Sequence, residues 1–332
     1  MSLVAFPRAA RIPAVGTGSP NFDRIVIGVD FASASLAAGR WATTCVAPHA
    51  HVVLVHIASP HSADFSAEID SRSPEAVVRR SAPALVGGLE GFGATLDIGS
   101  FSTVVRVGSP SQWLGAIAEP TGATLVVLGR RADSARQRVG EPNVLERVAR
   151  RTAASVLVVP EGTGGLPDQV LAVLDNSPLS GAVVAAADFV AKLHQIPLII
   201  AHVVPPASGA YRRVLDTARR NGRRRMRSPH EHIPATEMMS PDATEWCGEL
   251  VRAHSTARVD RVEIRVGDPV REIVSLSAEL GSTLVVAGKR GAHGAPIGSI
   301  GSITRTLLTS TPLPVLAIDD GKTSSYAETN AR

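Results

Sequence analysis

The chain has 332 residues, of which 44% are hydrophobic, 19% are charged and only 4% are aromatic, and its formal net charge is +4. This composition fits a soluble globular protein of about two domains with aliphatic cores. The charge is too small to indicate nucleic-acid binding by itself. No apolar run approaches the roughly 18 residues of a membrane span. The two cysteines lie far apart in the sequence, so we expect a reduced, cytoplasmic setting.

The first part of the chain alternates apolar runs with helical patterns. Residues 1–22 lack a sustained apolar core, so they are expected to be a flexible leader rather than a signal peptide. Apolar runs then predict strands near 24–30, 51–57, 103–107, 123–128 and 155–159. The first helix between them should bury one face, formed by Ala38, Trp41, Ala42 and Cys45.

The second part of the chain repeats the first. At an offset of 159 positions, ten of 25 residues are identical between 105–129 and 264–288. The same pattern puts Val183, Ala186, Ala187 and Val190 on one face of a helix. "PEGTGGLPD" at 160–168 has the composition of a linker. We therefore expect a first repeat over residues 23–160, a second over 168–319 and a tail over 320–332.

Strands and helices alternate in each repeat. The strands are nearly continuous apolar runs, as expected where both faces of a sheet are covered. This order predicts an α/β fold of two tandem doubly wound domains, each with a five-stranded parallel sheet. Strands 155–159 and 314–318 should pair the two repeats within the chain. Ligands of such sheets bind beyond the carboxyl ends of the strands, where the strand order switches.

The candidate binding residues lie at three predicted strand ends of the second repeat. Asp175 follows its first strand, and its carboxylate can accept hydrogen bonds from ribose hydroxyls. Val203 lies at the end of the next strand and can offer its backbone to an adenine edge. "GKRGAHGAPIGSIGS" (288–302) opens at Gly288 and Gly291, which permit positive φ and close backbone approach. It closes at Gly301 and Ser302, which begin a helix, a position that favours anions.

Together these motifs resemble the universal stress protein family. The nucleotide-binding motif of that family, G-x2-G-x9-G-S/T, is matched by Gly288, Gly291, Gly301 and Ser302, and the resemblance spans about residues 23–319. It implies a sheet of the adenine-nucleotide alpha-hydrolase type and ATP as the ligand. The binding residues it implies are Asp175, Val203 (through its backbone), Gly288, Gly291, Gly301 and Ser302. Mg²⁺ would come with the phosphates, since no carboxylate cage is visible.

The first repeat departs from this motif. Gly129 is retained, but Ala132 replaces the second glycine and Pro142-Asn143 replaces Gly-Ser. Proline has no N–H to donate, and Glu141 brings negative charge to the phosphate end of the loop. Several arginines could offset that charge, namely Arg130, Arg131, Arg136 and Arg138. We expect this repeat to bind nucleotide weakly or not at all.

Other interpretations remain open at this point. The glycine-rich loop could be a tight connection without a ligand, and Asp175 could cap the helix that follows it. His56 and His202 fit packed strand-end residues better than catalytic ones. The segment Arg219–Arg227, with six arginines, fits a solvated loop or a docking site for an acidic partner. It lacks the interleaved aromatics that would support nucleic-acid binding.

The resemblance also implies a role and an assembly. It indicates an ATP-binding protein with a regulatory or scaffolding role in stress responses, associated as a homo-oligomer such as a dimer. The alternatives are slow ATP hydrolysis or autophosphorylation, for which no catalytic base stands out, and a nucleotide-free interaction module. No metal site and no P-loop is evident.

Overall fold

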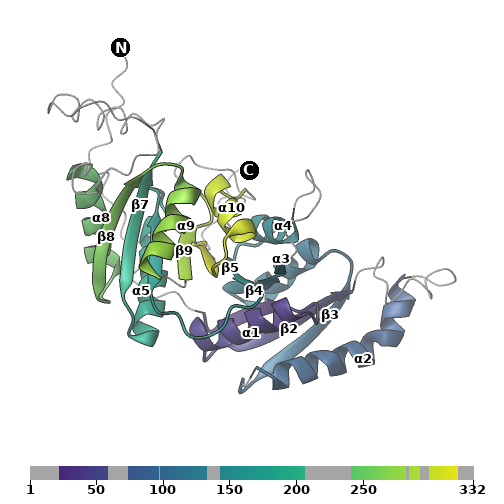
Figure 1. Ribbon diagram of the computed structural model, residues 1–332. Helices are drawn as coiled ribbons and strands as arrows, with labels where there is room; N and C mark the ends of the chain where they lie inside the picture. The colour runs from purple at the N-terminus through teal and green to yellow at the C-terminus, as the bar shows by residue number, and fades with distance from the viewer. Residues whose placement is uncertain are drawn as a thin grey trace, which may run out of the picture.

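A computed structural model describes residues 22–58, 74–96, 98–132, 143–205, 241–281, 284–291 and 299–320. In these ranges ten strands form one continuous sheet, in the order β3-β2-β1-β4-β5-β10-β9-β6-β7-β8 (Figure 1). Five parallel strands come from each repeat, so the predicted α/β fold of two tandem domains is confirmed, and the two five-stranded sheets join into one.

The strands follow the predicted apolar runs. Those of the first repeat end within two residues of the predicted positions. The strands are β1 (Arg24–Gly28), β2 (His51–Ala58), β3 (Phe101–Val107), β4 (Leu125–Arg130), β5 (Ser155–Pro160), β6 (Val170–Leu174), β7 (Leu198–Val204), β8 (Val259–Val266), β9 (Leu284–Gly288) and β10 (Val315–Ile318).

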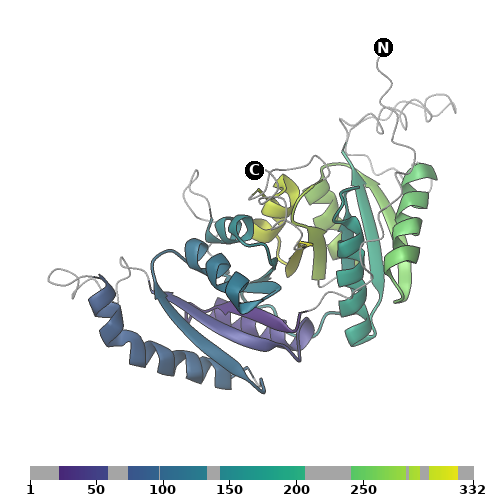
Figure 2. The same cartoon turned by 180° about the vertical axis from the view of Figure 1, so that it is seen from behind.

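The helices lie on both faces of the sheet, as Figures 1 and 2 show from opposite sides. Among the described residues, none of the helices is both long enough and apolar enough to cross a membrane. The helices are α1 (Ser33–Cys45), α2 (Pro74–Ala94), α3 (Pro110–Thr121), α4 (Val144–Arg151), α5 (Ser180–His194), α8 (Pro241–His254), α9 (Pro269–Leu280) and α10 (Ser302–Ser310).

Two apolar clusters explain why both faces are covered. One joins alternate strand residues such as Ile27 and Leu54 to α1, α2, α5 and α8, and includes the predicted helix faces around Trp41 and Val183. The other joins the intervening strand residues, such as Val53 and Val126, to α3, α4, α9 and α10. Each cluster contains residues of both repeats, so the hydrophobic core is continuous across the chain.

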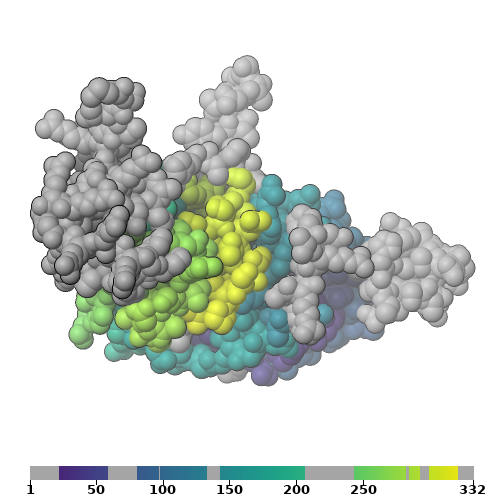
Figure 3. Space-filling view, turned by 45° about the horizontal axis from the view of Figure 1, so that its top comes forward, coloured from purple at the N-terminus to yellow at the C-terminus, as the bar shows by residue number. Residues whose placement is uncertain are grey.

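The two repeats meet at β5 and β10. All other strand pairs are parallel, but these two run antiparallel, with Leu157 opposite Leu316. The predicted pairing of 155–159 with 314–318 is therefore confirmed. Figure 3 shows the yellow carboxyl-terminal elements of the second repeat lying directly against the teal elements of the first. The strands that would otherwise form sheet edges are thus paired within the chain.

Two equivalent basic residues stabilise the junction of the two repeats at β5 and β10, here called the seam, from opposite sides. Lys289 Nζ donates to Thr152 O at 2.6 Å, just after α4, and pairs with Asp319 at 3.0 Å. Its counterpart Arg130 donates to Leu308 O at 3.2 Å and to Thr311 O, at the end of α10. Each repeat thereby places a buried cation at the carboxyl end of the other repeat's last helix, where the helix dipole favours positive charge. We expected Arg130 among the charges of the first repeat's loop, but it serves this contact instead.

Candidate functional site

The candidate site lies where the strand order of the second repeat switches. β6 pairs with β7 on one side and with β9 on the other, and all three strands run parallel. Their carboxyl ends therefore reach the same edge of the sheet. Asp175 follows β6 directly, and the loop 289–291 follows β9. This is the place where doubly wound sheets bind ligands.

Asp175 and two of the predicted glycines are close together at this edge. A methyl group added at Gly291 would lie 3.2 Å from Asp175 Oδ2. One added at Gly301 would lie 3.5 Å from Gly291 N. The Gly301 N–H donates to Lys289 O at 2.8 Å, which closes the ends of the loop on each other. The fold thus brings together a carboxylate and two residues that are 116 and 126 positions further along the chain.

Close approach, and not a left-handed backbone, is what these glycines provide. A methyl group at Gly288 would lie 3.3 Å from both Leu179 Cβ and Arg290 O. The Gly288 carbonyl also accepts a 2.6 Å hydrogen bond from Thr304 Oγ1 of α10. Neither Gly288 nor Gly291 is among the described residues with positive φ. Of the two properties that glycine permits here, only close backbone approach is used at these two positions.

Val203 lies beside Asp175 through the strand register. Leu174 is opposite His202 in the β6–β7 pair, so one further step along both strands reaches Asp175 and Val203. The Val203 side chain is buried in the core. Only its backbone can therefore contribute to the crevice, in line with the role that the resemblance implies.

The first turn of α10 has no side-chain cap. Its N-cap residue is Gly301, and Ser302 is the first helical residue. The equivalent helix of the first repeat, α4, is capped by Asn143, whose side chain accepts a 3.0 Å hydrogen bond from Leu145 N. Uncapped N–H groups at a helix start are available to an anion, whereas the Asn143 side chain uses one of them.

The first repeat fills its own crevice with charged side chains. Arg131 forms an ion pair with Asp30, the counterpart of Asp175, at 2.9 Å. The Glu161 carboxylate accepts hydrogen bonds from the Ser33 hydroxyl and, at 3.2 Å, from Ala132 N, the counterpart of Gly291 N. The Ser33 hydroxyl, followed by the Ala132 N–H, lowers the pKa of Glu161. Glu141 and Pro142, which we expected to disfavour phosphate here, lie outside the described residues, as do Arg136 and Arg138.

The second repeat arranges the equivalent groups differently. Arg290 pairs with Asp319 at 3.0 Å and with Asp320 at 3.2 Å, and not with Asp175. Among the described residues, none accepts a hydrogen bond from the Gly291 N–H. On the described part of the chain, Asp175 therefore has no ion pair and the Gly291 N–H has no acceptor, unlike their counterparts in the first repeat.

Two buried serines near Asp175 were not among our candidates. The hydroxyls of Ser177 and Ser180 have no hydrogen-bond partner among the described residues, and both residues are more than nine-tenths buried. The Ser177 N–H donates to Asp175 Oδ1 at 3.2 Å, so Asp175 forms a local turn and does not cap α5, which begins at Ser180. The signal for Ser177 was present in the sequence as "DNS", where the first repeat has "DFA" with Ala32.

The two strand-end histidines are packed against neighbouring groups. His56 Nδ1 and His202 Nδ1 each lie 2.8 Å from a carbonyl of the preceding strand or its end, Val29 O and Leu174 O respectively. The His56 ring contacts Phe31, and the His202 ring contacts Trp246 of α8 edge-to-face. These contacts agree with the structural interpretation of both residues.

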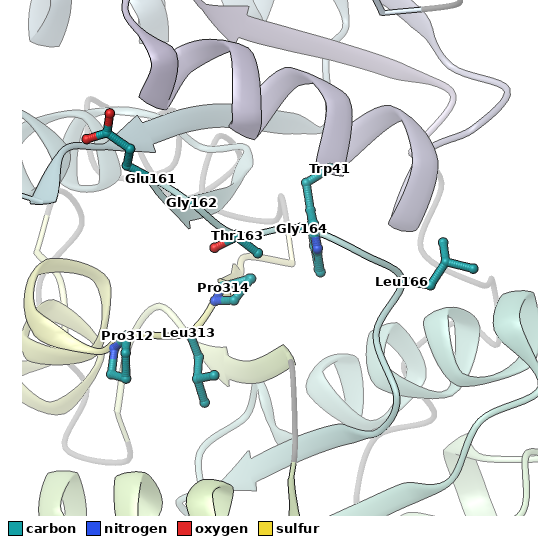
Figure 4. A pocket seen from close by; sticks show the side chains of 9 residues that line it. All are labelled: Trp41, Glu161, Gly162, Thr163, Gly164, Leu166, Pro312, Leu313 and Pro314. Carbon is teal, nitrogen blue, oxygen red and sulfur yellow. The ribbon is translucent and has the colours of Figure 1, made fainter.

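A separate cavity of about 230 Å³ lies near the linker between the repeats (Figure 4). Trp41 of α1 and the Pro312–Pro314 segment border it on opposite sides of the linker chain. None of the six candidate residues lines it, so it is distinct from the strand-end crevice. The lining residues are Trp41, Glu161, Gly162, Thr163, Gly164, Leu166, Pro312, Leu313 and Pro314.

Comparison with known proteins identifies the family. The sequence matches the Universal stress protein family twice, over residues 21–160 and 167–319. The chain belongs to the universal stress protein family. Comparison with the curated proteins gave no match.

Solved structures similar to this universal stress protein support the tandem fold. One is a universal stress protein from Archaeoglobus fulgidus, with 18% identity, a TM-score of 0.57, and coverage of 90% of this chain and 99% of that one. Another is a putative universal stress protein from Pseudomonas aeruginosa, with 13% identity, a TM-score of 0.59, and coverage of 95% and 99%. At these identities the likeness concerns the fold alone.

Proposed function

We propose that this protein is an ATP-binding universal stress protein with a regulatory or scaffolding role, and that its second repeat holds the nucleotide. The observation that carries this proposal is the contrast between the repeats. Asp30, Ala132 N and the start of α4 are each engaged by side chains of the first repeat. Their counterparts, Asp175 Oδ2, Gly291 N and the first turn of α10, have no such side-chain partner on the described part of the chain.

Each group suits one part of ATP. The Asp175 carboxylate would accept hydrogen bonds from the ribose hydroxyls, and the Val203 backbone would meet the adenine edge. Backbone N–H groups at Gly291 and Ser302, with the Ser302 hydroxyl, would bind the phosphates, which Gly288 and Gly301 allow to come close. The unpartnered Ser177 hydroxyl beside Asp175 also fits a polar ligand, because buried polar groups are normally satisfied.

The loop's own cations contribute little charge to such a site. Lys289 is directed to Thr152 and Asp319, and Arg290 to Asp319 and Asp320. Phosphate binding would then depend on backbone donors, worth about 1.5–3 kcal/mol each. Two or three of them correspond to millimolar-to-micromolar affinity before association costs. Mg²⁺, if it accompanies ATP, would be held largely through the phosphates.

A paired substitution tests the proposal. Asp175→Asn should weaken ATP binding about 10- to 100-fold, as loss of a charge-assisted hydrogen bond predicts, and Asp30→Asn should leave it unchanged. Isothermal titration of both variants and the wild type measures this directly. Equal losses in the two variants, or no binding by the wild type, would contradict the proposal and favour a nucleotide-free interaction module. Turnover of ATP by the wild type but not by Asp175→Asn would favour the enzymatic alternative.

Assembly, location and partners complete the proposal. Because β5 and β10 already pair within the chain, a homo-oligomer would need another surface, and the mass in solution tests for one. The cytoplasmic location stays a prediction, as does the acidic partner at Arg219–Arg227, a segment outside the described residues.

A further inference from the structure

The arginines at one equivalent position of the two repeats have different partners. Arg131 and Arg290 occupy equivalent positions, immediately before Ala132 and Gly291. Arg131 crosses the crevice to Asp30, and 60% of its side chain is exposed. Arg290 turns instead to Asp319 and Asp320, and only 17% of its side chain is exposed. An arginine at this position can therefore reach either the crevice carboxylate or the end of the last strand.

The residues after the last strand account for this difference. Pro160 stands in the first repeat where Asp319 stands in the second, so Arg131 has no acid at that position. Glu161, the counterpart of Asp320, is already engaged by Ser33 and Ala132 N. Asp30 is then the carboxylate with which Arg131 pairs.

The acids of the second repeat are held in place by the seam. Asp319 is buried, pairs with the buried Lys289 at 3.0 Å, and donates its own N–H to Ser155 Oγ at 3.1 Å. Ser155 belongs to the first repeat, so the first repeat helps to fix the carboxylate that retains Arg290. Asp320 adds a second contact to the same guanidinium nitrogen.

We propose that Asp319 and Asp320 are positioning residues that keep Arg290 away from Asp175, and so leave this carboxylate free to recognise ribose hydroxyls. The inference rests on the proposed ATP site and deepens it. Recognition of the ribose would then depend on Asp319 and Asp320, although neither carboxylate contacts the sugar. It also gives the first repeat a function in the site of the second, through Ser155.

The test compares ATP with 2′,3′-dideoxy-ATP, which has the same phosphates but lacks the ribose hydroxyls. The wild type should prefer ATP by about tenfold, through Asp175. In Asp319→Asn/Asp320→Asn, Arg290 should move to Asp175 and reduce that preference to about threefold or less. Adding Arg290→Gln to the two changes should restore the preference. Because each result is a ratio of two Kd values, a general effect of charge on the triphosphate cancels.

Two outcomes would overturn the inference: an unchanged preference in the double variant, or no recovery when Arg290→Gln is added. If the double variant does not fold, Asp320→Asn with and without Arg290→Gln provides the same comparison. A crystal structure of the acid variant without nucleotide is the independent measurement. It should show the Arg290 guanidinium on Asp175, and a guanidinium that stays in place contradicts the inference. Failure of the wild type to bind ATP would refute the proposed function, and the crystal structure alone would then decide the positioning role.

Discussion

Arg131 Nη2 lies 2.9 Å from Asp30 Oδ2, so the first repeat neutralises internally a carboxylate whose counterpart in the second repeat, Asp175, has no such ion pair among the described residues. The pair is largely exposed and contributes little to stability. Its importance is that it occupies the crevice. The Glu161 carboxylate also accepts a hydrogen bond from Ala132 N. Because these contacts occupy the first crevice, the first repeat is an internal control for ligand binding by the second.

Gly291→Ala should weaken ATP binding about tenfold, because the added methyl group would lie 3.2 Å from Asp175 Oδ2 and displace it. The free energy of unfolding should change by less than about 1 kcal/mol, since the backbone of Gly291 is not left-handed. Titration calorimetry and urea unfolding measure the two effects. The matched variant Ala132→Gly should bind ATP as the wild type does, because Glu161 remains in the first crevice. Wild-type affinity in Gly291→Ala would show that the loop does not approach the ligand.

Lys289→Met should lower the free energy of unfolding by about 3 kcal/mol, because it removes one of the two cations paired with the buried Asp319 carboxylate and also the donor to Thr152 O. Adding Asp319→Asn should recover part of this loss. Urea unfolding of these variants measures both effects. Arg305→Met is the control: Arg305 also reaches across the seam, to Glu146 at 3.9 Å, but it is half-exposed, and its loss should cost less than about 1 kcal/mol. Similar losses in the two single variants would contradict the role assigned to Lys289.

The Asp188 carboxylate should make stability depend on acid pH. Burial alone would raise the pKa of Asp188, but hydrogen bonds from Ala257 N, the Ser255 hydroxyl, Lys192 and Thr256 N lower it overall. Because the folded-state pKa is below the unfolded one, the stabilisation is complete above about pH 4 and is lost as the pH falls further.

Asp188→Asn should therefore destabilise the protein by about 1–3 kcal/mol at pH 7 and reduce the difference in stability between pH 5 and pH 3. Urea midpoints at these pH values test this. A variant that loses as much stability on acidification as the wild type would assign the acid sensitivity to other groups.

The two thiols should be unreactive in the folded protein. Burial raises the pKa of both Cys45 and Cys247 to about 12, so neither forms the nucleophilic thiolate at pH 8. A colourimetric thiol reagent should detect two groups per chain in denaturant and none within minutes in native buffer. Rapid labelling of a native thiol would show that its helix, α1 or α8, opens readily.

Much of this architecture could be predicted from the sequence, because the offset between the repeats shows which residues occupy equivalent positions. The strands and the meeting of Asp175 with the glycine loop follow from the alternating apolar runs and the rules of parallel sheets. The antiparallel β5–β10 pairing follows from the need of two edge strands for a partner. The sequence did not distinguish whether Gly288 and Gly291 are needed for positive φ or for close packing, since glycine permits both.

The contacts across the seam could not be predicted in the same way. The partners of Arg130 and Lys289 are backbone carbonyls at helix ends, which carry no sequence signal. The hydrogen bond from Ala132 N to the Glu161 carboxylate depends on β4 lying beside β5, with Arg130 opposite Pro160. The only sign of it in the sequence is the exchange of Pro160-Glu161 for Asp319-Asp320 at the same offset.

The number of ATP molecules bound per chain tests the central claim most directly. Native mass spectrometry of the 34.6 kDa protein, at an ATP concentration just sufficient to saturate the wild type, should count one nucleotide per chain, with full occupancy in Asp30→Asn and clearly reduced occupancy in Asp175→Asn. Two nucleotides per chain, or one that is lost with Asp30 and retained without Asp175, would contradict the assignment of the site to the second repeat.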